Sequence, residues 1–504
     1  MLTPAGYPCW KIRFTPTMCG TWRYSIRVRD GSGERSTKPS KFLCIASPDR
    51  GFITVSKADR RYFSFTDGSF FYPLGLNVRS PTDTRFAALM KRKVDPDTGT
   101  LYYEQLFSRM RENDENFAEI WMASWFAALE WVENRPGYRG LGYYNLKNAW
   151  KLDTILDSAR ENDIRLQVVL INHGQLSSFC DQEWQDNPYN AKNGGFLTRP
   201  EEFFTNRKAQ ELTRRKIRYI MARWAYSPNI FSWVLINEMN LIGSDGRFYT
   251  MPTLGNWYGE IGGYLKENDP WHHPVSGHYT ILVDNNLVRS PVVDFVITNA
   301  YYDVSKNETL AQLIKRITEF TARFQKPAFI SEFGGTPMGG TDDNLVRDIV
   351  TGLWTSYHLP LAGAPLFWWH RFVDERGLHG LYKNLCAYGR DMNRPAMDFR
   401  QETATVQGAG GDKMGLLIMG SAGCTAGWLW DPVTGGNPAN PPLEERGPFE
   451  ITLSGKTGSA YRVVYWDMEK GPGREMTIRP DAQKLIVPIP PFKKWTAFKI
   501  VPVP

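Results

Sequence analysis

The chain has 504 residues, of which 42% are apolar and 22% are charged, a composition typical of a globular protein and unlike that of a disordered or fibrous one. Its net charge of +7 is mild for this length, so short basic clusters such as "LTRRKIRYIMARW" indicate solvated faces rather than a nucleic-acid-binding surface. No run of about 18 apolar residues occurs, so no transmembrane helix is expected.

The first 47 residues contain three alternating segments that predict strands: "WKIRFTP", "WRYSIRVRD" and "KFLCIAS". Three strands are too few for a stable domain of their own. We therefore interpret residues 1–47 as a partial N-terminal β-sandwich, whose first strands are absent or supplied otherwise.

Residues 48–398 begin with a hairpin that turns at Asp67-Gly68, and strands then alternate with helical segments. Eight strands are predicted, at 70–77, 117–124, 166–172, 230–237, 273–278, 294–302, 327–333 and 364–370. This alternation indicates an α/β fold, the (β/α)8 TIM barrel. The alternative is an open doubly wound sheet, which would usually carry a glycine-rich phosphate turn after its first strand; "PLGLNVRSP" is not such a turn.

From residue 399 to 504 the pattern changes to seven short strands separated by Gly, Pro and Asp, which predicts a C-terminal β-sandwich. The chain is also rich in aromatic residues, with 18 Trp and 23 Tyr. Flat rings suit sugar faces, although packing within a large barrel explains them about equally well.

The six cysteines are widely spaced, with no CxxC pair and no Cys/His metal spacing, and they fit free thiols about as well as one or two disulfides. His272-His273 is expected at the start of a strand, away from the barrel mouth. We therefore expect no metal site. The N-terminal "MLTPAGYPCW" lacks the features of a signal peptide.

In a TIM barrel, side chains at the carboxyl ends of the strands line the active site. Two carboxylates occupy such ends, Glu238 after the fourth predicted strand and Glu332 on the seventh, on nearly opposite sides of the mouth. Glycoside hydrolysis requires such a pair, one a protonated acid and the other ionised. A single strand-end glutamate is more often a salt bridge at the rim, but two opposed ones favour catalysis.

Two motifs carry a resemblance to a known superfamily. "YSPNIFSWVLINEMN" resembles the fourth-strand signature of clan A glycoside hydrolases, which include glycoside hydrolase family 5, and "PAFISEFGG" resembles their seventh strand. The resemblance implies that Glu238 is the acid/base and Glu332 the nucleophile of a retaining mechanism. It also implies that Asn237 binds the sugar 2-hydroxyl.

Other strand ends match family 5 less closely. Tyr301 matches the tyrosine that supports the nucleophile, but Asn299 stands where the family has histidine. His173 lies near the position of the third-strand histidine, and Trp368 or Trp369 matches the tryptophan that floors the sugar site.

The family also has an arginine at the end of the second strand, where this chain has Ser124-Trp125. Arg79 is the candidate substitute. The remaining candidates for substrate binding come from the strand ends themselves: Asn77, Trp125 and His278. These departures indicate a divergent branch of the clan.

The resemblance extends to the flanks, since the N-terminal segment is similar to a module of unknown function found ahead of such barrels in bacterial enzymes.

Together, these features predict a retaining hydrolase of β-glycosidic bonds that needs no cofactor, with carbohydrate as its partner and neither nucleic acid nor membrane. Long loops after residues 124 and 172 favour exo-action or short oligosaccharides. The alternatives are a carbohydrate-binding protein that has lost turnover and a transglycosylase. An extracellular or periplasmic location in a bacterium is expected, although no signal peptide is visible.

Overall fold

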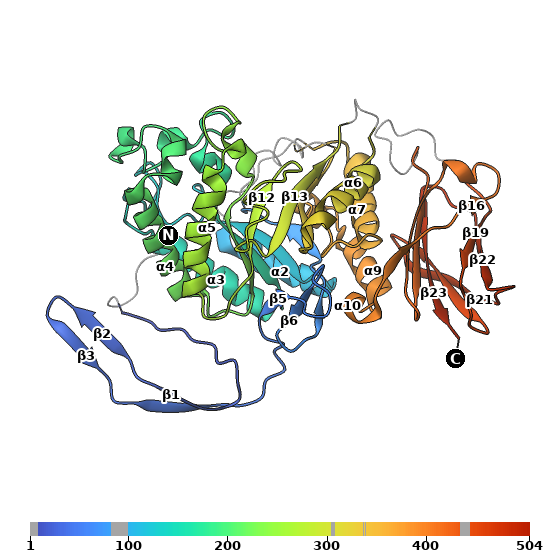
Figure 1. Ribbon diagram of the computed structural model, residues 1–504, viewed down its shortest axis with the longest axis horizontal. Coiled ribbons are helices and arrows are strands. Elements are labelled where there is room, and N and C mark those ends of the chain that lie inside the picture. The colour runs from blue at the N-terminus through green and yellow to red at the C-terminus, as the bar shows by residue number, and fades with distance from the viewer. Residues whose placement is uncertain are drawn as a thin grey trace.

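The computed structural model describes residues 9–81, 99–303, 308–335, 337, 339–433 and 444–503. Three parts follow one another along the longest axis of the molecule (Figure 1). A thin β-ribbon projects at the N-terminal end, a barrel with its helices forms the middle, and two β-sheets form the C-terminal end.

The central sheet is parallel and nearly closed, with its strands in chain order around the barrel. Its strands are β8 (Gly75–Asn77), β9 (Phe117–Trp121), β10 (Arg165–Ile171), β11 (Ile230–Ile236), β12 (Val275–Tyr279), β13 (Phe295–Tyr301) and β14 (Ala328–Gly334). Residues 364–370, predicted as the eighth strand, close the barrel between β14 and β8 through isolated backbone contacts instead of a continuous strand ladder. Leu76 bridges to Phe367, and the Leu366 N–H donates to the Ile330 carbonyl at 2.9 Å. The predicted TIM barrel is thus confirmed.

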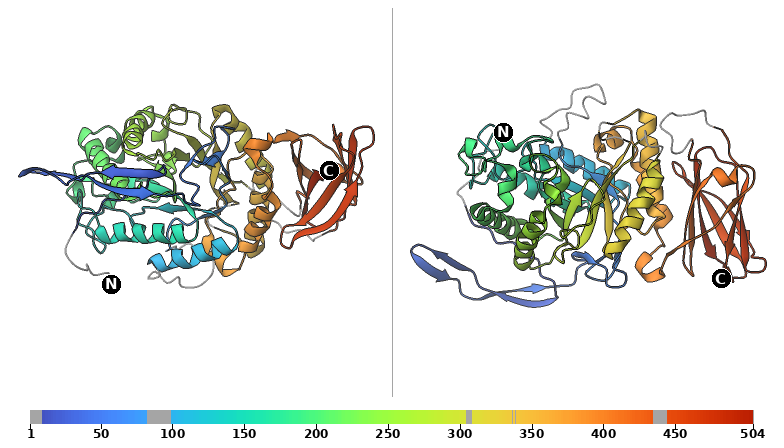
Figure 2. Two further views of the ribbon diagram at one scale, coloured as in Figure 1. Left: turned by 90° about the horizontal axis from the view of Figure 1, so that it is seen from below. Right: turned by 45° about the horizontal axis from the view of Figure 1, so that its top comes forward.

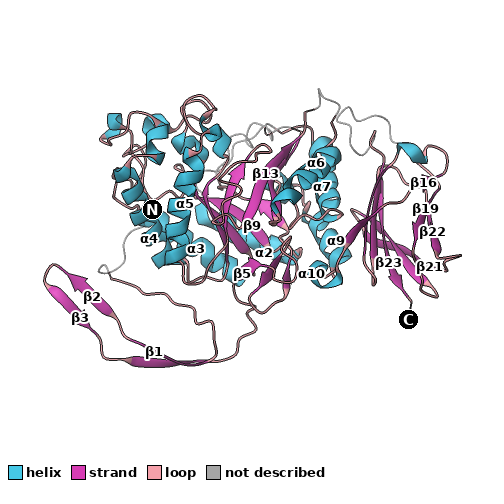
Figure 3. Ribbon diagram, viewed as in Figure 1, coloured by secondary structure: helices cyan, strands magenta, loops and turns pink. Residues whose placement is uncertain are grey.

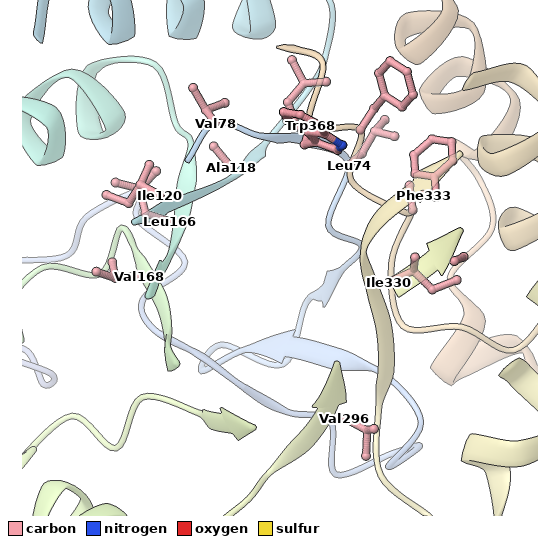
Figure 4. Packing of buried hydrophobic residues seen from close by; sticks show 14 of the residues in the cluster. Leu74, Val78, Ala118, Ile120, Leu166, Val168, Val296, Ile330, Phe333 and Trp368 are labelled. Carbon is pink, nitrogen blue, oxygen red and sulfur yellow. The ribbon is translucent and has the colours of Figure 1, made fainter. Parts of the chain in front are cut away.

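Helices cover the outside of this sheet in every view (Figures 2 and 3). They are α2 (Gly99–Glu112), α3 (Leu146–Glu161), α4 (Arg207–Trp224), α5 (Thr253–Asn268), α6 (Leu310–Thr321), α7 (Asp342–Tyr357), α8 (His370–Glu375), α9 (His379–Gly389) and α10 (Arg394–Met397). Because side chains alternate along a strand, every second residue packs against these helices, as Ile120, Leu166 and Val168 do (Figure 4).

The amino-terminal floor of the barrel is sealed by the predicted hairpin. Its strands are β5 (Ile53–Val55), β6 (Phe63–Phe65) and β7 (Phe70–Phe71). The Phe63 ring packs edge-on against Phe231 and Phe295, with centroids 4.8 and 5.3 Å apart. The predicted strand 70–77 is therefore two strands, of which the first joins the hairpin and the second the barrel. Pro73 separates them, and proline cannot donate a ladder hydrogen bond.

The N-terminal ribbon consists of two antiparallel pairs, β1 with β4 and β2 with β3. Its strands are β1 (Gly20–Tyr24), β2 (Arg27–Asp30), β3 (Gly33–Ser36) and β4 (Ser40–Cys44). The prediction of a strand over "WKIRFTP" is wrong. That segment follows the barrel surface instead, where the Thr15 carbonyl accepts a hydrogen bond from Trp271 Nε1 at 2.9 Å and the Phe14 ring packs on Trp271.

The C-terminal part is the predicted β-sandwich, with one sheet of six strands and one of three. The strands are β15 (Arg400–Glu402), β16 (Val406–Gln407), β17 (Gly415–Gly420), β18 (Thr425–Trp430), β19 (Phe449–Ser454), β20 (Tyr461–Asp467), β21 (Gly471–Ile478), β22 (Lys484–Ile489) and β23 (Trp495–Pro502). It docks on the barrel helices through aromatic residues. Tyr388 Oη donates to the Phe498 carbonyl at 2.8 Å, and the Trp354 and Trp428 rings stack.

Two further sequence-based expectations concern cysteines and membranes. All six cysteines are free thiols. Among the described helices, none combines the length and apolarity that crossing a bilayer requires.

One buried cation ties the barrel to the start of the C-terminal segment. The Arg394 guanidinium is inaccessible to solvent and donates to the carbonyls of Tyr357, Leu359 and Leu361. It also lies 4.8 Å from the centroid of the Tyr72 ring.

Replacing Arg394 with methionine should lower the free energy of unfolding by about 2–4 kcal/mol, because three buried carbonyls would lose a charged donor. Chemical denaturation followed by tryptophan fluorescence measures this change. Arg400→Met is the matched control, since that side chain is exposed and bonds Asp398 alone among the described side chains. Equal stability of the two variants would contradict this account of Arg394.

Candidate active site

Two buried carboxylates lie at the carboxyl-terminal mouth of the barrel. Glu238 is the second residue after the end of β11, and Glu332 lies near the end of β14. Each is 7% exposed. Two strands, β12 and β13, separate them in the barrel, so the carboxylates approach from well-separated sides of the mouth. The two groups are nevertheless close enough for the charge of Glu238 to raise the pKa of Glu332.

Glu332 is held by two donors from other strands. Tyr301 Oη donates to its Oε2 at 2.8 Å, and Asn77 Nδ2 donates to its Oε1 at 3.3 Å. Burial and the charge of Glu238 raise the pKa of Glu332 well above its ordinary value, while the Tyr301 hydrogen bond opposes that rise. The two donors fix the orientation of the carboxylate and favour its ionised form.

Glu238 is held from the opposite side. Asn299 Nδ2 donates to its Oε1 at 2.8 Å, and His173 Nδ1 lies 2.9 Å from its Oε2. Burial would raise the pKa of Glu238, but the charge and hydrogen bonding of His173 lower it. The Glu238 backbone is left-handed, with φ of 44°, which non-glycine residues seldom adopt.

The Asn299 side chain contacts three other polar residues at the barrel mouth: Glu238, His278 and Ser331. Its Oδ1 lies 2.7 Å from His278 Nε2 and accepts from Ser331 Oγ at 3.3 Å. These contacts orient the amide so that its nitrogen faces Glu238. The structure thus places Asn299 in contact with Glu238 and His278 in contact with Asn299; that the two residues bind substrate stays a prediction.

His173 and Asn237 adjoin one another at the ends of β10 and β11. The His173 N–H donates to Asn237 Oδ1 at 2.8 Å, and the His173 ring continues through Nε2 to Asp181 at 3.0 Å. Burial opposes protonation of the ring, but Glu238 and Asp181 raise the pKa of His173 well above its ordinary value. Asn237 Nδ2 is buried without a hydrogen-bond partner among the described residues, so it can donate to a ligand.

A third carboxylate, Glu119 on β9, lies in the barrel interior. It accepts from Trp121 Nε1 at 2.6 Å and from Asn77 Nδ2 at 3.1 Å, and it also bonds Gln167. Burial raises the pKa of Glu119 to about 7. Sequence reasoning missed this residue, although an acidic side chain at the centre of "FAEIW" was the available signal. Asn77 therefore joins Glu119 to Glu332 rather than serving Glu332 alone.

Aromatic rings and one cation form the wall beside Glu332. The Arg79 guanidinium lies 4.7 Å from the Trp368 ring centroid and 5.6 Å from that of Trp121, and its charge acts to lower the pKa of Glu332. Arg79 thus lies beside these rings with its charge acting on Glu332, and its role as substitute for the family's second-strand arginine stays a prediction. Trp369 stacks on Trp368 with centroids 4.1 Å apart.

The end of the second barrel strand carries a polar network. Ser124 donates to Glu183 and accepts from Arg135 Nη1 at 3.1 Å, while Asn172 Nδ2 donates to Glu183 Oε1 at 2.6 Å. Burial raises the pKa of Glu183. Trp125, the other predicted residue here, is half-buried and donates through Nε1 to Ser80 Oγ at 3.0 Å.

No family model matches the chain. Mannan endo-1,4-beta-mannosidase 4 of Solanum lycopersicum is 26% identical over 311 residues, covering 54% of this chain and 72% of that protein. A glycoside hydrolase family 5 structure from Bacteroides vulgatus covers 90% of this chain and 94% of its own, with 12% identity and a TM-score of 0.55.

The chain is a family 5-like glycoside hydrolase. This family 5-like hydrolase also matches mannan endo-1,4-beta-mannosidase F of Aspergillus clavatus at 25% identity over 242 residues. That match covers 43% of the hydrolase and half the length of the fungal protein. A putative glycoside hydrolase structure from Bacteroides vulgatus, 15% identical with a TM-score of 0.55, covers 98% of it, which extends the shared fold beyond the barrel.

Proposed function

We propose that this hydrolase cleaves β-1,4-mannosidic bonds with retention of configuration, using Glu332 as nucleophile and Glu238 as acid/base. The observation that carries the proposal is Glu332 held by Tyr301 and Asn77 while Glu238 approaches from another strand with its own donors. The choice of mannan is supported by relatives named mannan endo-1,4-beta-mannosidases.

The two carboxylates are coupled through charge, so their protons must be considered together. A charged His173 favours the carboxylate form of Glu238 and leaves the proton on Glu332. When the His173 ring is neutral, its Nδ1 can accept a hydrogen bond from a protonated Glu238, and Glu332 is then ionised. We propose that this second distribution is the productive one.

In the first step, the Glu332 carboxylate attacks the anomeric carbon while Glu238 donates its proton to the departing glycosidic oxygen. In the second, Glu238 removes a proton from water, and that water releases the sugar from Glu332. Asn237 Nδ2 donates to a substrate hydroxyl, since it is buried without a partner among the described residues. The Trp368 ring supports the sugar beside the nucleophile.

For the position of cleavage we propose chain ends or short oligosaccharides. The segment between β10 and α4 carries four short helical turns instead of a simple connection: η1 (His173–Leu176), η2 (Trp184–Asp186), η3 (Ala191–Asn193) and η4 (Pro200–Phe204). Long loops at the mouth of a barrel can close one end of the substrate groove and so limit the length of chain that binds there. The relatives are named as endo-acting mannosidases, so this proposal separates the present hydrolase from them.

The test is incubation of the purified protein with linear β-1,4-mannan, mannooligosaccharides, cellulose and xylan, with products followed by chromatography and proton NMR. We expect hydrolysis of the mannan substrates, an initial product of β configuration, and small products from the outset. Cleavage of glucan or xylan alone would overturn the sugar assignment. An initial α product would overturn the retaining mechanism, and a broad early distribution of lengths would overturn the end-directed mode.

Replacing Tyr301 with phenylalanine should lower kcat about 10- to 100-fold with little change in KM. The variant loses the hydroxyl that donates a hydrogen bond to the Glu332 carboxylate. A hydrogen bond to a charged group contributes about 1.5–3 kcal/mol. Steady-state kinetics on an aryl β-mannoside measure the effect. Tyr302→Phe is the matched control, because its hydroxyl bonds Asp348 instead. Similar kcat values for the two variants would contradict the role given to Tyr301.

A further inference from the structure

Beside the catalytic acid, three side chains of different chemistry converge on one point. His173, Cys180 and Asp181 each offer a ligand atom, and these atoms all lie within 4.8 Å of one another. His173 Nε2 is 3.0 Å from Asp181 Oδ2, and the Cys180 side chain also interacts with the His173 ring. The ring's other nitrogen faces Glu238.

We propose that His173, Cys180 and Asp181 bind a zinc-class divalent cation and that its binding inhibits the hydrolase. Thiolate, imidazole and carboxylate are the ligands of zinc, and atoms sharing one tetrahedral zinc lie roughly 3–4 Å apart, so ligation requires shifts of only about 1 Å. The thiolate selects Zn²⁺ or Cd²⁺ over Mg²⁺ and Ca²⁺, which prefer oxygen ligands. Water would fill the fourth position.

The loop that carries the ligands is built to a fixed shape. The Glu183 N–H donates to the Gly174 carbonyl at 3.0 Å, and the Cys180 N–H donates to Ser177 Oγ at 3.0 Å. A Cβ on Gly174 would approach the Asp181 carbonyl oxygen to 2.5 Å, so the loop folds closely back on itself. The ligands are therefore held near one another before any cation arrives.

A cation can reach this point from solvent. The Asp181 side chain is 44% exposed and Cys180 is partly exposed, whereas the His173 side chain is only 4% exposed. A cation would thus enter past the first two residues and meet the imidazole at the bottom. On binding, the proton of the Cys180 thiol and any proton on His173 Nε2 would be released to solvent, and the thiolate and the imidazole nitrogen would bind the cation.

The effect on catalysis follows from the second contact of His173. A dication on Nε2 places positive charge one imidazole ring from the carboxylate that must deliver a proton to the leaving oxygen. Inhibition should therefore be strong for mannooligosaccharides and weak for dinitrophenyl mannosides, whose leaving group needs little acid assistance. This effect on turnover rests on the proposed function, whereas cation binding does not.

The binding test is titration of the full chain with Cd²⁺, followed by the ultraviolet charge-transfer absorbance of the cadmium–thiolate bond. We expect one equivalent of absorbance in the wild type that is absent in Cys180→Ser and weakened at least about tenfold in affinity in Asp181→Asn, since asparagine also tolerates the left-handed φ of 43°. Cys386→Ser is the control thiol variant and should titrate like the wild type. Identical titrations of the wild type and Cys180→Ser would overturn the site.

The inhibition test uses the same proteins with Zn²⁺, with Mg²⁺ as the control ion. We expect Zn²⁺ to inhibit mannooligosaccharide cleavage by the wild type and Cys386→Ser at least about tenfold more strongly than cleavage by Cys180→Ser, with reversal by EDTA. Equal inhibition of the wild type and Cys180→Ser would overturn the link to turnover. If mannan proves not to be the substrate, the cadmium titration still decides whether the cation site exists.

Discussion

Replacing Glu332 with alanine should abolish turnover, lowering kcat by at least about 10⁴-fold on every substrate, because no glycosyl-enzyme can form. Glu119 shares the Asn77 amide with Glu332 but cannot replace it, since Glu119 lies in the barrel interior with Asn77 between the two. Release of nitrophenol from an aryl β-mannoside measures the loss.

The stereochemistry of rescue distinguishes a lost nucleophile from a damaged fold. Azide should enter the space left by the Glu332 carboxylate and give a glycosyl azide of inverted configuration. Glu319→Ala, at an exposed position on α6, is the matched control and should keep wild-type kcat. A rescued product of retained configuration would contradict the assignment of Glu332.

Replacing Glu238 with alanine should produce a different pattern. Cleavage of mannooligosaccharides should fall about 10²- to 10⁴-fold, because the leaving oxygen is no longer protonated. Dinitrophenyl mannosides should still form the glycosyl-enzyme, so a fast initial burst should precede slow release. Azide should accelerate that release and give a product of retained configuration.

The two variants therefore test separate roles at one site. Wild-type kcat in both would show that neither glutamate is catalytic and would favour the alternative of a carbohydrate-binding protein. If Glu238→Ala with azide gave a glycosyl azide of inverted configuration, Glu238 would be the nucleophile and Glu332 the acid/base. Rapid-quench kinetics and NMR of the azide products distinguish these outcomes.

The barrel was predictable because its strands have strong local signals. "LQVVLIN" and "IFSWVLIN" are apolar runs that end in polar residues, and both form strands within one residue of the predicted ends. The N-terminal "WKIRFTP" alternates apolar and polar residues, which also predicts a strand, but it forms none, because it contacts Trp271, more than 250 positions away. Sequence alternation carries no information about such a distant partner.

The candidate site was predictable to the extent that strand ends define a barrel mouth. The positions of Glu238, Glu332 and Tyr301 followed from that rule and from the motifs. What each side chain bonds did not follow. Asn299 was expected to face substrate, yet its amide faces Glu238, because His278 and Ser331 occupy its other side.

Asp181 shows a further limit of sequence reasoning. It lies in an irregular loop with no periodic pattern, and its contact with His173 depends on a tight return of the chain at Gly174. Six residues lie between His173 and Cys180, a spacing that matches none of the usual zinc motifs. Only the folded loop brings the three ligands together.

The left-handed backbone of Glu238 has a consequence for the evolution of this protein. An L-residue with a φ of 44° carries about 1–2 kcal/mol of conformational strain that glycine would not, and a buried carboxylate adds a desolvation cost. The fold therefore holds Glu238, the proposed acid/base, in a backbone conformation that this residue type disfavours. Libraries selected for heat resistance without an activity screen should accumulate glycine at position 238, gaining thermal tolerance as they lose the enzyme.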